Sequence, residues 1–253
     1  MLSEERQRII LDIIHKEGRV LVTELAPRLG ASQFTIRNDL NALHGQGLVH
    51  RTHGGALPVR VGSLSDPSFR NKENLMRREK QRIGRAAAKL AKPEQSVILD
   101  SGTTTMAVAR ALRTVGHLTV ITAAINIAAE LSGSSIDVIV TGGLLRDDSL
   151  SLIGPVAEVM LGRFTADIAF LGADGFDARF GLTSPNVSEA KIKQLLVEIS
   201  RRTVVVCDSS KFGLRFLSVA APLSQIQQVI TDTGVSKPDR RFMEDAGIEV
   251  TVV

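Results

Sequence analysis

The stretch ASQFTIRNDL, residues 31–40, has the pattern of a short helix that turns polar side chains away from a core. Ser32 can cap this helix, because its hydroxyl can accept a hydrogen bond from a free amide of the first turn. Apolar side chains at helical spacing are expected to form the buried face: Ile36, Leu40 and Leu43. Side chains of another kind face the opposite way: Phe34, Asn38 and Asn41, with Arg37 on the flank.

Two more helices and a hairpin are predicted around this helix. Residues 4–17 carry four isoleucines at helical spacing, and residues 20–22 form a short strand candidate. Thr23 is expected to cap a second helix that runs to Leu29. Pro27 is unusual inside so short a helix and is tolerable only within its first turn, where an amide is unpaired in any case. LVHRTHGGA, residues 48–56, is typical of a strand followed by a glycine turn. This order of elements predicts a winged helix-turn-helix.

A helix of this size fits the major groove of B-DNA, which is about 12 Å wide. Asparagine can bond to adenine, arginine to guanine or phosphate, and phenylalanine can contact a thymine methyl. The predicted contacts in and before the helix are Ser32, Gln33, Phe34, Thr35, Arg37 and Asn38. Arg51 and His53 of the wing are expected to touch phosphate, although either is equally typical of a hairpin surface. The alternative is a three-helix protein–protein module with a solvated polar face.

The composition sets limits on the whole chain. Its 253 residues, 43% of them hydrophobic, suit roughly two domains. The single cysteine, Cys207, excludes an internal disulfide framework and fits a reducing cytoplasm. The charged N-terminus is unlike a signal peptide, and no apolar run reaches the roughly 20 residues of a membrane span. We therefore expect a cytoplasmic protein with no membrane partner.

The distribution of charge does not by itself identify a DNA-binding segment. Residues 1–57 hold seven Lys and Arg against six Asp and Glu, a balance of +1. Residues 70–92 hold nine against two, a balance of +7. The basic run is typical of a solvated helix face, and the alternative is a contribution to non-specific phosphate attraction.

Residues 58–69, PVRVGSLSDPSF, have the proline, glycine and serine content of a linker. We place the domains at 1–57 and 73–253, with a linker at 58–72. In the second domain, apolar strand candidates alternate with helical segments, and this alternation predicts an α/β fold with a mostly parallel sheet covered on both faces. The strand candidates are SVILD, LTVIT, DVIVT, IAFLG, TVVVC, QVIT and EVTVV, and the helices lie near 79–91, 104–113, 124–132, 188–200 and 238–246.

Polar residues gather where these strands end, which is where ligands bind in such folds. DSGTTT follows the first strand and opens a helix, so its small residues and free amides suit a phosphate: Asp100, Ser101, Gly102, Thr103, Thr104 and Thr105. Later strands end in TGG (Thr141, Gly142, Gly143), in GADGFD at 172–177 and in DSSKFG at 208–213. A lysine beside an anion cradle, here Lys211, can pair with phosphate.

Each of these residues also has a purely structural interpretation. Serine and threonine cap helices, and glycines allow positive φ in turns. Asp174 is typical of a turn cap, and Glu189 suits the first turn of a helix. The cluster nevertheless predicts a ligand site with Asp174, Glu189 and Lys211 among its residues.

Taken together, these motifs resemble the DeoR-type bacterial transcriptional regulators. ELAPRLGASQFTIRNDLNAL followed by GLVHRTHGGA is similar to their DNA-binding domain, although Asn38 stands where the family usually has a basic residue, and Pro27 also departs. DSGTTT, TGG, GADGFDARFGLTSPNVSEAK and DSSKFG resemble their sugar-phosphate-sensing domain, which is similar to ribose-5-phosphate isomerase.

The resemblance implies that Ser101 to Thr105 hold phosphate, that Asp174, Glu189 and Lys211 face the sugar, and that Asn126 also lines the pocket. Thr122-Ala123-Ala124 stands where the family often has T-N-S, which removes an amide.

The leading hypothesis is a transcriptional regulator, a repressor of a carbohydrate-metabolism operon, whose partners are double-stranded operator DNA and a phosphorylated sugar. We expect a homo-oligomer, no cofactor, no metal site and no catalytic residue. One alternative is an isomerase-like enzyme, since a carboxylate base and a lysine suit aldose–ketose proton transfer. Another is a DNA-binding protein whose pocket is vestigial.

Overall fold

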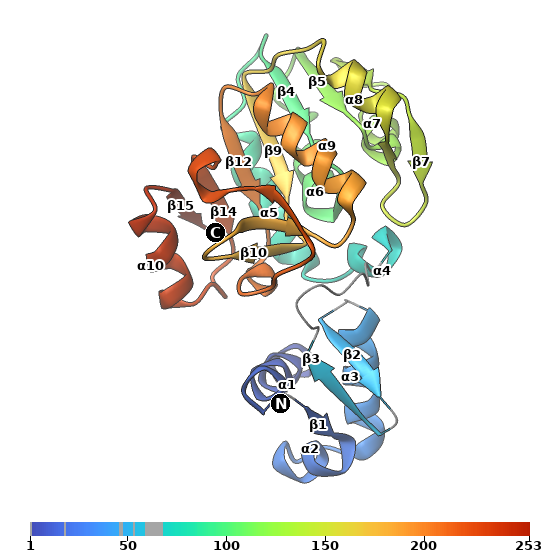
Figure 1. The fold of residues 1–253 in the computed structure, drawn as a ribbon, viewed down its shortest axis with the longest axis vertical. Helices are drawn as coiled ribbons and strands as arrows, with labels where there is room; N and C mark the ends of the chain where they lie inside the picture. The colour runs from blue at the N-terminus through green and yellow to red at the C-terminus, as the bar shows by residue number, and fades with distance from the viewer. Residues whose placement is uncertain (1, 18, 46–47, 53, 59–67) are drawn as a thin grey trace. The chain divides into compact units, whose positions relative to one another are not determined.

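The computed structural model describes residues 2–17, 19–45, 48–52, 54–58 and 68–253. The chain separates into two compact units, Met1–Pro67 and Ser68–Val253 (Figure 1). Most of the predicted linker, at residues 59–67, lies outside the described residues.

The first unit contains three helices and a small antiparallel sheet. Its elements are α1 (Ser3–Glu17), β1 (Val20–Leu21), α2 (Val22–Arg28), α3 (Gln33–Gly45), β2 (Val49–Thr52) and β3 (Gly55–Pro58). The strands pair in the order β1-β3-β2, so the hairpin of β2 and β3 extends from the short strand β1 (Figure 1). This arrangement confirms the predicted winged helix-turn-helix.

The core of this unit is formed by one face of each helix. Its fully buried side chains include Ile10 and Ile14 of α1, Leu25 of α2, and Ile36, Leu40 and Leu43 of α3. The predicted buried face of α3 is therefore confirmed. Asp39 is also buried on α3 and accepts a hydrogen bond of 2.5 Å from Nε of Arg6, which fixes α3 against α1. Since a buried carboxylate needs a partner, this ion pair selects one packing of the two helices.

The start of α2 differs from the prediction. Leu21, not Thr23, occupies the N-cap position, and Pro27 lies near the end of the helix rather than in its first turn. The reason is a contact from the wing, since the Val22 amide donates to the Gly54 carbonyl at 2.8 Å. This carbonyl takes the role expected of a capping side chain, so the helix begins one residue before Thr23. A Cβ at Gly55 would lie 2.0 Å from the Val20 carbonyl oxygen, so glycine lets the wing approach β1.

The second unit is built on a parallel sheet of seven strands, in the order β15-β14-β12-β9-β4-β5-β6. All of its strand pairs are parallel. Its strands are β4 (Ser96–Leu99), β5 (Leu118–Thr122), β6 (Ile136–Val140), β9 (Ile168–Gly172), β12 (Thr203–Val206), β14 (Gln228–Thr231) and β15 (Glu249–Val252). These are the seven predicted strand segments, which confirms the predicted α/β class.

Helices cover both faces of this sheet. One face packs against α5 (Arg77–Ala88), α6 (Thr103–Leu112) and α7 (Ile125–Leu131). The other packs against α8 (Pro155–Leu161), α9 (Val187–Glu198) and α10 (Lys237–Asp245), together with a small sheet of β10 (Gly175–Asp177), β11 (Gly181–Ser184) and β13 (Ser218–Ala221). Along β4, Val97 and Leu99 join the first core and Ile98 the second, as the alternation of a strand requires.

Four shorter elements complete the unit. The strands β7 (Leu144–Arg146) and β8 (Ser151–Ile153) form a hairpin, and two 3-10 turns span η1 (Ser209–Lys211) and η2 (Leu223–Gln225). None of these was predicted from the sequence, because each is short.

Residues 69–72 form part of a helix, α4 (Phe69–Glu73), and not the end of a linker as predicted. The reason is that Phe69 is buried in the core shared with α5 and α6. Most of the Lys and Arg side chains at residues 70–92 are exposed, as expected of a solvated helix face, and Lys72 and Arg82 are half-buried. Lys80 is buried and donates to the Lys72 carbonyl at 2.7 Å.

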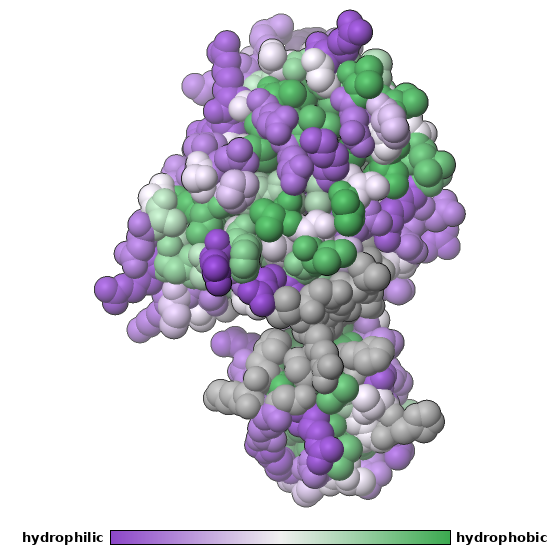
Figure 2. Space-filling model, viewed as in Figure 1, coloured by the Kyte–Doolittle hydropathy of each residue, from purple (hydrophilic) through white to green (hydrophobic). Residues whose placement is uncertain are grey.

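The surface of the second unit mixes polar and apolar side chains. Figure 2 shows hydrophobic side chains over α8 and β7, where Leu144, Val156 and Val159 are exposed. None of the helices in the described part of the chain has both the length and the apolar character needed to cross a membrane.

Substitutions on the two faces of α3 separate its core from its surface. Ile36→Ala should lower the free energy of unfolding by about 2–5 kcal/mol, because it leaves a cavity in the core. Phe34→Ala should change it by less than about 0.5 kcal/mol, because 70% of the Phe34 side chain is exposed. Urea unfolding followed by circular dichroism measures both. Equal losses of stability would show that α3 packs differently.

Candidate functional site

The outward face of α3 carries the side chains predicted to contact DNA. Gln33, Phe34, Arg37 and Asn38 are exposed. Ser32 caps the helix as predicted, since its Oγ accepts from the Thr35 amide at 3.0 Å. Thr35 is half-buried, and its hydroxyl lies 2.8 Å from Ser32 Oγ, so both hydroxyls take part in the cap.

The wing is tied to α3 through Arg51. Its Nε donates to Asn41 Oδ1 at 3.0 Å, and its Nη1 donates to the Gly55 carbonyl at 2.6 Å. Arg51 therefore holds the hairpin against the outward face of α3, a role that its sequence position did not reveal. Its remaining donors are those available to a phosphate. His53, the other wing residue predicted to touch phosphate, lies outside the described residues.

The strand order of the second unit places a topological switch point at the carboxyl end of β4, and we call the region outside these strand ends the crevice. From β4 the chain continues to β5 and β6 on one side, whereas β9, β12, β14 and β15 lie on the other. Ligands in open parallel sheets bind at such a switch point, outside the carboxyl ends of the strands. The segments that meet there are Asp100–Thr105 after β4 and Ala173–Asp174 after β9. Both contain residues that we predicted to bind the effector.

A buried ion pair between Asp100 and α9 holds Gly172, the last residue of β9, beside the loop after β4. Lys193 of α9 pairs with Asp100 and donates to the Gly172 carbonyl at 3.1 Å. Asp100 also accepts from the Gly172 amide at 3.0 Å. Burial opposes the charge on Lys193, but the carboxylates of Asp100 and Asp174 outweigh it and raise the pKa of the amine. Since Asp100 is occupied in this way, it holds the crevice together and its carboxylate already has partners.

Asp174 lies among lysines. Lys72 of α4 pairs with it, with 3.5 Å between Nζ and Oδ1, and Ser184 Oγ donates to Oδ2 at 3.1 Å. Burial alone would favour the neutral acid, yet the charges of Lys72, Lys193 and Lys211 lower the pKa of Asp174 below its usual range. The crevice therefore combines an ionised carboxylate, which can accept from sugar hydroxyls, with amines that suit an anion.

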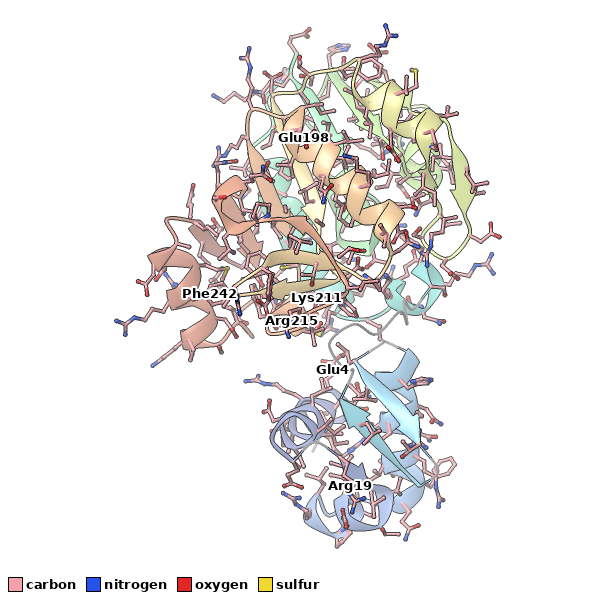
Figure 3. The ribbon with its side chains drawn as sticks, in the orientation of Figure 1. Glu4, Arg19, Glu198, Lys211, Arg215 and Phe242 are labelled. Atoms are coloured by element: carbon pink, nitrogen blue, oxygen red, sulfur yellow. The ribbon has the colours of Figure 1, made fainter. Side chains whose placement is uncertain are left out.

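Lys211 is the amine best placed to receive a new partner. Among the described residues, its amine forms no hydrogen bond or ion pair, and the side chain is partly exposed. Figure 3 labels it in the segment after β12, next to the place where Phe212 bridges to Phe176 of β10. An anion in the crevice would give this charge a partner.

The loop before α6 has the geometry of an anion cradle. Gly102 occupies the N-cap position with φ 148°, a conformation that favours glycine. The Met106 amide makes the first bond of the helix, to the Gly102 carbonyl. The amides before it have no acceptor within the helix. Thr104 is buried and Ser101 and Thr103 are half-buried, whereas the Thr105 hydroxyl donates to the Gly102 carbonyl.

Glu189 lies in the first turn of α9, as its sequence position suggested, and is buried. Its Oε1 accepts from Arg146 of β7 at 3.2 Å and from Ser151 of β8 at 3.3 Å. It also contributes to the raised pKa of Lys193. Glu189 therefore belongs to the same charge cluster as Asp100 and Asp174.

Thr141, Gly142 and Gly143 follow the edge strand β6, which is separated from β4 by β5, so they lie to one side of the switch point. The Thr141 hydroxyl donates to the Gly142 carbonyl. Gly143 has φ 121°, and a Cβ there would lie 2.8 Å from the Ile153 carbonyl oxygen. Close packing against β8 thus accounts for Gly143 without a ligand.

Asn126 begins α7 beyond the carboxyl end of β5, the neighbour of β4. Both polar atoms of its carboxamide are buried without a hydrogen-bond partner. An unpaired buried polar group costs about 1–3 kcal/mol, so a ligand or a water would stabilise this position. Within the described parts of the chain, no group of three or more His, Cys, Asp or Glu is arranged to hold a metal ion.

Comparison with known families assigns a domain type to each of the two units. The DeoR-like helix-turn-helix domain matches residues 6–60, and the DeoR C terminal sensor domain matches residues 76–233. The chain belongs to the DeoR family of transcriptional regulators. Its first unit is thus the family's DNA-binding domain, and its second unit is the sensor domain.

Relatives align over almost the whole chain. The HTH-type transcriptional regulator GlpR of Haloferax volcanii is 38% identical over 99% of this chain and 98% of its own. The transcriptional repressor AccR of Agrobacterium fabrum is 33% identical over 92% and 90%. Ribose 5-phosphate isomerase A of Methanocaldococcus jannaschii aligns with 54% of this chain and 55% of its own at 18% identity, with a TM-score of 0.41.

Sequence reasoning missed three charged residues of the crevice, Lys72, Lys193 and Arg146. Lys193 left a signal, since it follows Glu189 by four residues and shares its helix face with buried Leu196. Two charges in a buried stripe require partners. Lys72 left no such signal, because its partner Asp174 comes from a distant part of the chain. Arg146 has a local partner, Asp148, but its contact with Glu189 also joins distant parts of the chain.

Breaking the ion pair at the switch point should destabilise the sensor domain. Lys193→Met leaves the Asp100 carboxylate buried without its counter-charge and should cost about 3–5 kcal/mol. Lys191→Met is the matched control, because Lys191 lies on the same helix but is exposed. Urea unfolding of the full chain compares them. Equal stability of the two variants would contradict a structural role for the pair.

Proposed function

We propose that this regulator is a repressor of a carbohydrate-metabolism operon and that a phosphorylated sugar controls its affinity for operator DNA. The main observation in support of this proposal is that two candidate sites occur in one chain. An anion-suited crevice lies at the switch point of the sensor domain, and a groove-reading helix lies in the other domain.

The chemistry of the crevice supports a phosphorylated ligand over a free sugar. The amides before α6 suit an anion, and Lys72 and Lys211 supply positive charge in the cluster around Asp174. Asp174 and the unpaired carboxamide of Asn126 suit the hydroxyls of a sugar. We propose that the effector site is formed by Asp100–Thr105, Asp174, Glu189 and Lys211. Lys72 lies in the same cluster of charges, because it pairs with Asp174.

The state of Asp174 favours binding over turnover. Aldose–ketose isomerisation needs a base whose pKa lies near the working pH, and the surrounding lysines lower the pKa of Asp174 instead. We therefore propose a sensor without catalysis. Isomerase turnover in the range of about 1–1000 per second with pentose or hexose phosphates would overturn this.

DNA recognition also bears on the oligomeric state and the cellular location of the protein. Helix-turn-helix proteins commonly read paired half-sites as dimers, so we propose a cytoplasmic homo-oligomer. The name of the relative AccR, a transcriptional repressor, supports repression over activation.

Arg37 is expected to contact the operator. Arg37→Ala should weaken binding by about 1–3 kcal/mol, the usual worth of a base contact, without lowering stability. Arg19→Ala removes the same charge from an exposed position outside α3 and serves as control. Fluorescence anisotropy with DNA selected by the wild-type protein from a random library reports the affinities. If both variants bind like the wild type, the recognition face is wrongly assigned.

The crevice is expected to set the response to effector. A panel of ribose 5-phosphate, fructose 1-phosphate, glucose 6-phosphate and their free sugars is titrated against the complex with selected DNA. A phosphorylated member should release the DNA, with a change in affinity of about 5–150-fold. Thr104→Val and Lys211→Met should bind DNA normally and respond only at higher concentration, because each removes a polar or charged group that we assign to the anion.

Lys237→Met is the control for the loss of charge, since Lys237 is exposed at the start of α10. It should respond like the wild type. No shift by any member of the panel, or an equal effect of the free sugars, would sink the phosphate-sensing assignment.

A further inference from the structure

Helix α4 is the first element of the sensor domain, which begins at Ser68. It has five residues, too few to be stable as an isolated helix, so its position depends on tertiary contacts. The chain leads from α4 back to the DNA-binding domain. Among the helices and strands of the sensor domain, α4 is thus the one nearest in sequence to that domain.

One polar contact of α4 leads directly into the crevice. Lys72 and Asp174 form an ion pair of 3.5 Å, and their side chains are only 18% and 20% exposed. The carbonyl of the same Lys72 accepts from buried Lys80 of α5. The backbone of Lys72 is thus held by the sheet-covering layer, while its side chain reaches a carboxylate that we assign to the effector site.

The other end of α4 is joined to the second effector carboxylate. The Phe69 amide donates to the Asp148 carbonyl at 2.5 Å, in the turn between β7 and β8. The Asp148 carboxylate accepts from Arg146 at 3.3 Å, and Arg146 pairs with Glu189 at 3.2 Å. Both ends of the helix are therefore connected to predicted effector residues, through Asp174 at one end and Glu189 at the other.

We propose that Lys72 is an effector-binding residue and the one through which the effector acts on the DNA-binding domain. In the unliganded protein, Lys72 pairs with Asp174. When a phosphorylated sugar enters the crevice, the Lys72 amine pairs with its phosphate, and α4 shifts with it. This inference rests on the proposed sugar-phosphate function. It adds the residue and the helix through which ligand binding would affect the DNA-binding domain.

The charges in the crevice explain why the exchange is favourable. A phosphate monoester carries about 1.5 to 2 negative charges and three acceptor oxygens, against one charge for a carboxylate. Asp174 does not lose all compensation when Lys72 leaves, because Lys193 and Lys211 also act on it. A ligand can shift an equilibrium only by its differential affinity for two states, and the choice of partner for Lys72 supplies such a difference.

The test compares Lys72→Met with Arg70→Met in the full chain. Arg70 lies on the same helix and is exposed, so its substitution removes equal charge from α4. The probe is whichever of ribose 5-phosphate, fructose 1-phosphate and glucose 6-phosphate shifts wild-type DNA affinity most. Probe binding is measured by calorimetry, and affinity for selected DNA by anisotropy, without probe and with saturating probe.

Lys72→Met should bind DNA within about twofold of the wild type when no probe is present. Its affinity for the probe should fall about tenfold, and saturating probe should change its DNA affinity less than about twofold, against about 5–150-fold in the wild type. Loss of all probe binding would equally support Lys72 as a ligand residue. Lys72→Arg should restore both properties, which a purely structural role would not require.

A Lys72→Met protein that responds to probe as Arg70→Met does would overturn this inference and leave the proposed function standing. Absence of any response in the wild type would overturn both. Hydrogen exchange of residues 68–76 gives a second readout without DNA. The probe should change it in the wild type and not in Lys72→Met.

Discussion

The buried ion pair between Asp100 and Lys193 is the constraint on which the sensor domain depends. It joins the loop after β4 to α9, and both side chains also bond to Gly172 at the end of β9, so it holds together the two strands between which the order of the sheet reverses. Two buried charges stabilise a fold only when each has its partner, so this pair permits one arrangement of the two strand ends. That arrangement places the loop before α6 and Asp174 at the carboxyl ends of two neighbouring strands, β4 and β9.

Helix α4 is held in place mainly by polar contacts. The first helix of the sensor domain contributes one buried side chain, Phe69, and its other anchors are polar. Lys72 meets Asp174 at the crevice, and Asp148 connects the helix to Arg146 and Glu189. Polar anchors can change partner when an anion arrives, whereas an apolar anchor cannot. A sensor that must respond to a charged ligand therefore benefits from a helix held in this way.

The sequence predicted the elements of the fold better than their arrangement. All seven strands of the main sheet were found, because each is a short apolar run buried on both faces. The order of the strands in the sheet was not predictable from the sequence. The contact between Asp100 and Gly172 was therefore not predictable either, because it depends on β4 and β9 being neighbours. The buried face of α3 followed from helical spacing, but the start of α2 did not, since the Gly54 carbonyl replaces the cap expected at Thr23.

The residues of the candidate site also differ in whether the sequence predicted them. Residues of strand ends and helix starts, such as Thr104, Asp174 and Glu189, were visible as local motifs. Lys72 and Lys193 were not, because they enter the crevice from helices whose partners lie about a hundred residues away in the chain. A crystal structure of the full chain with a bound sugar phosphate tests the proposed phosphate site and the change of partner of Lys72 most directly. The phosphate should lie within about 2.7–3.2 Å of the amides of residues 102–104 and of Lys72 Nζ, with the Lys72–Asp174 pair broken. A phosphate bound away from the carboxyl end of β4, with that pair intact, would contradict both proposals.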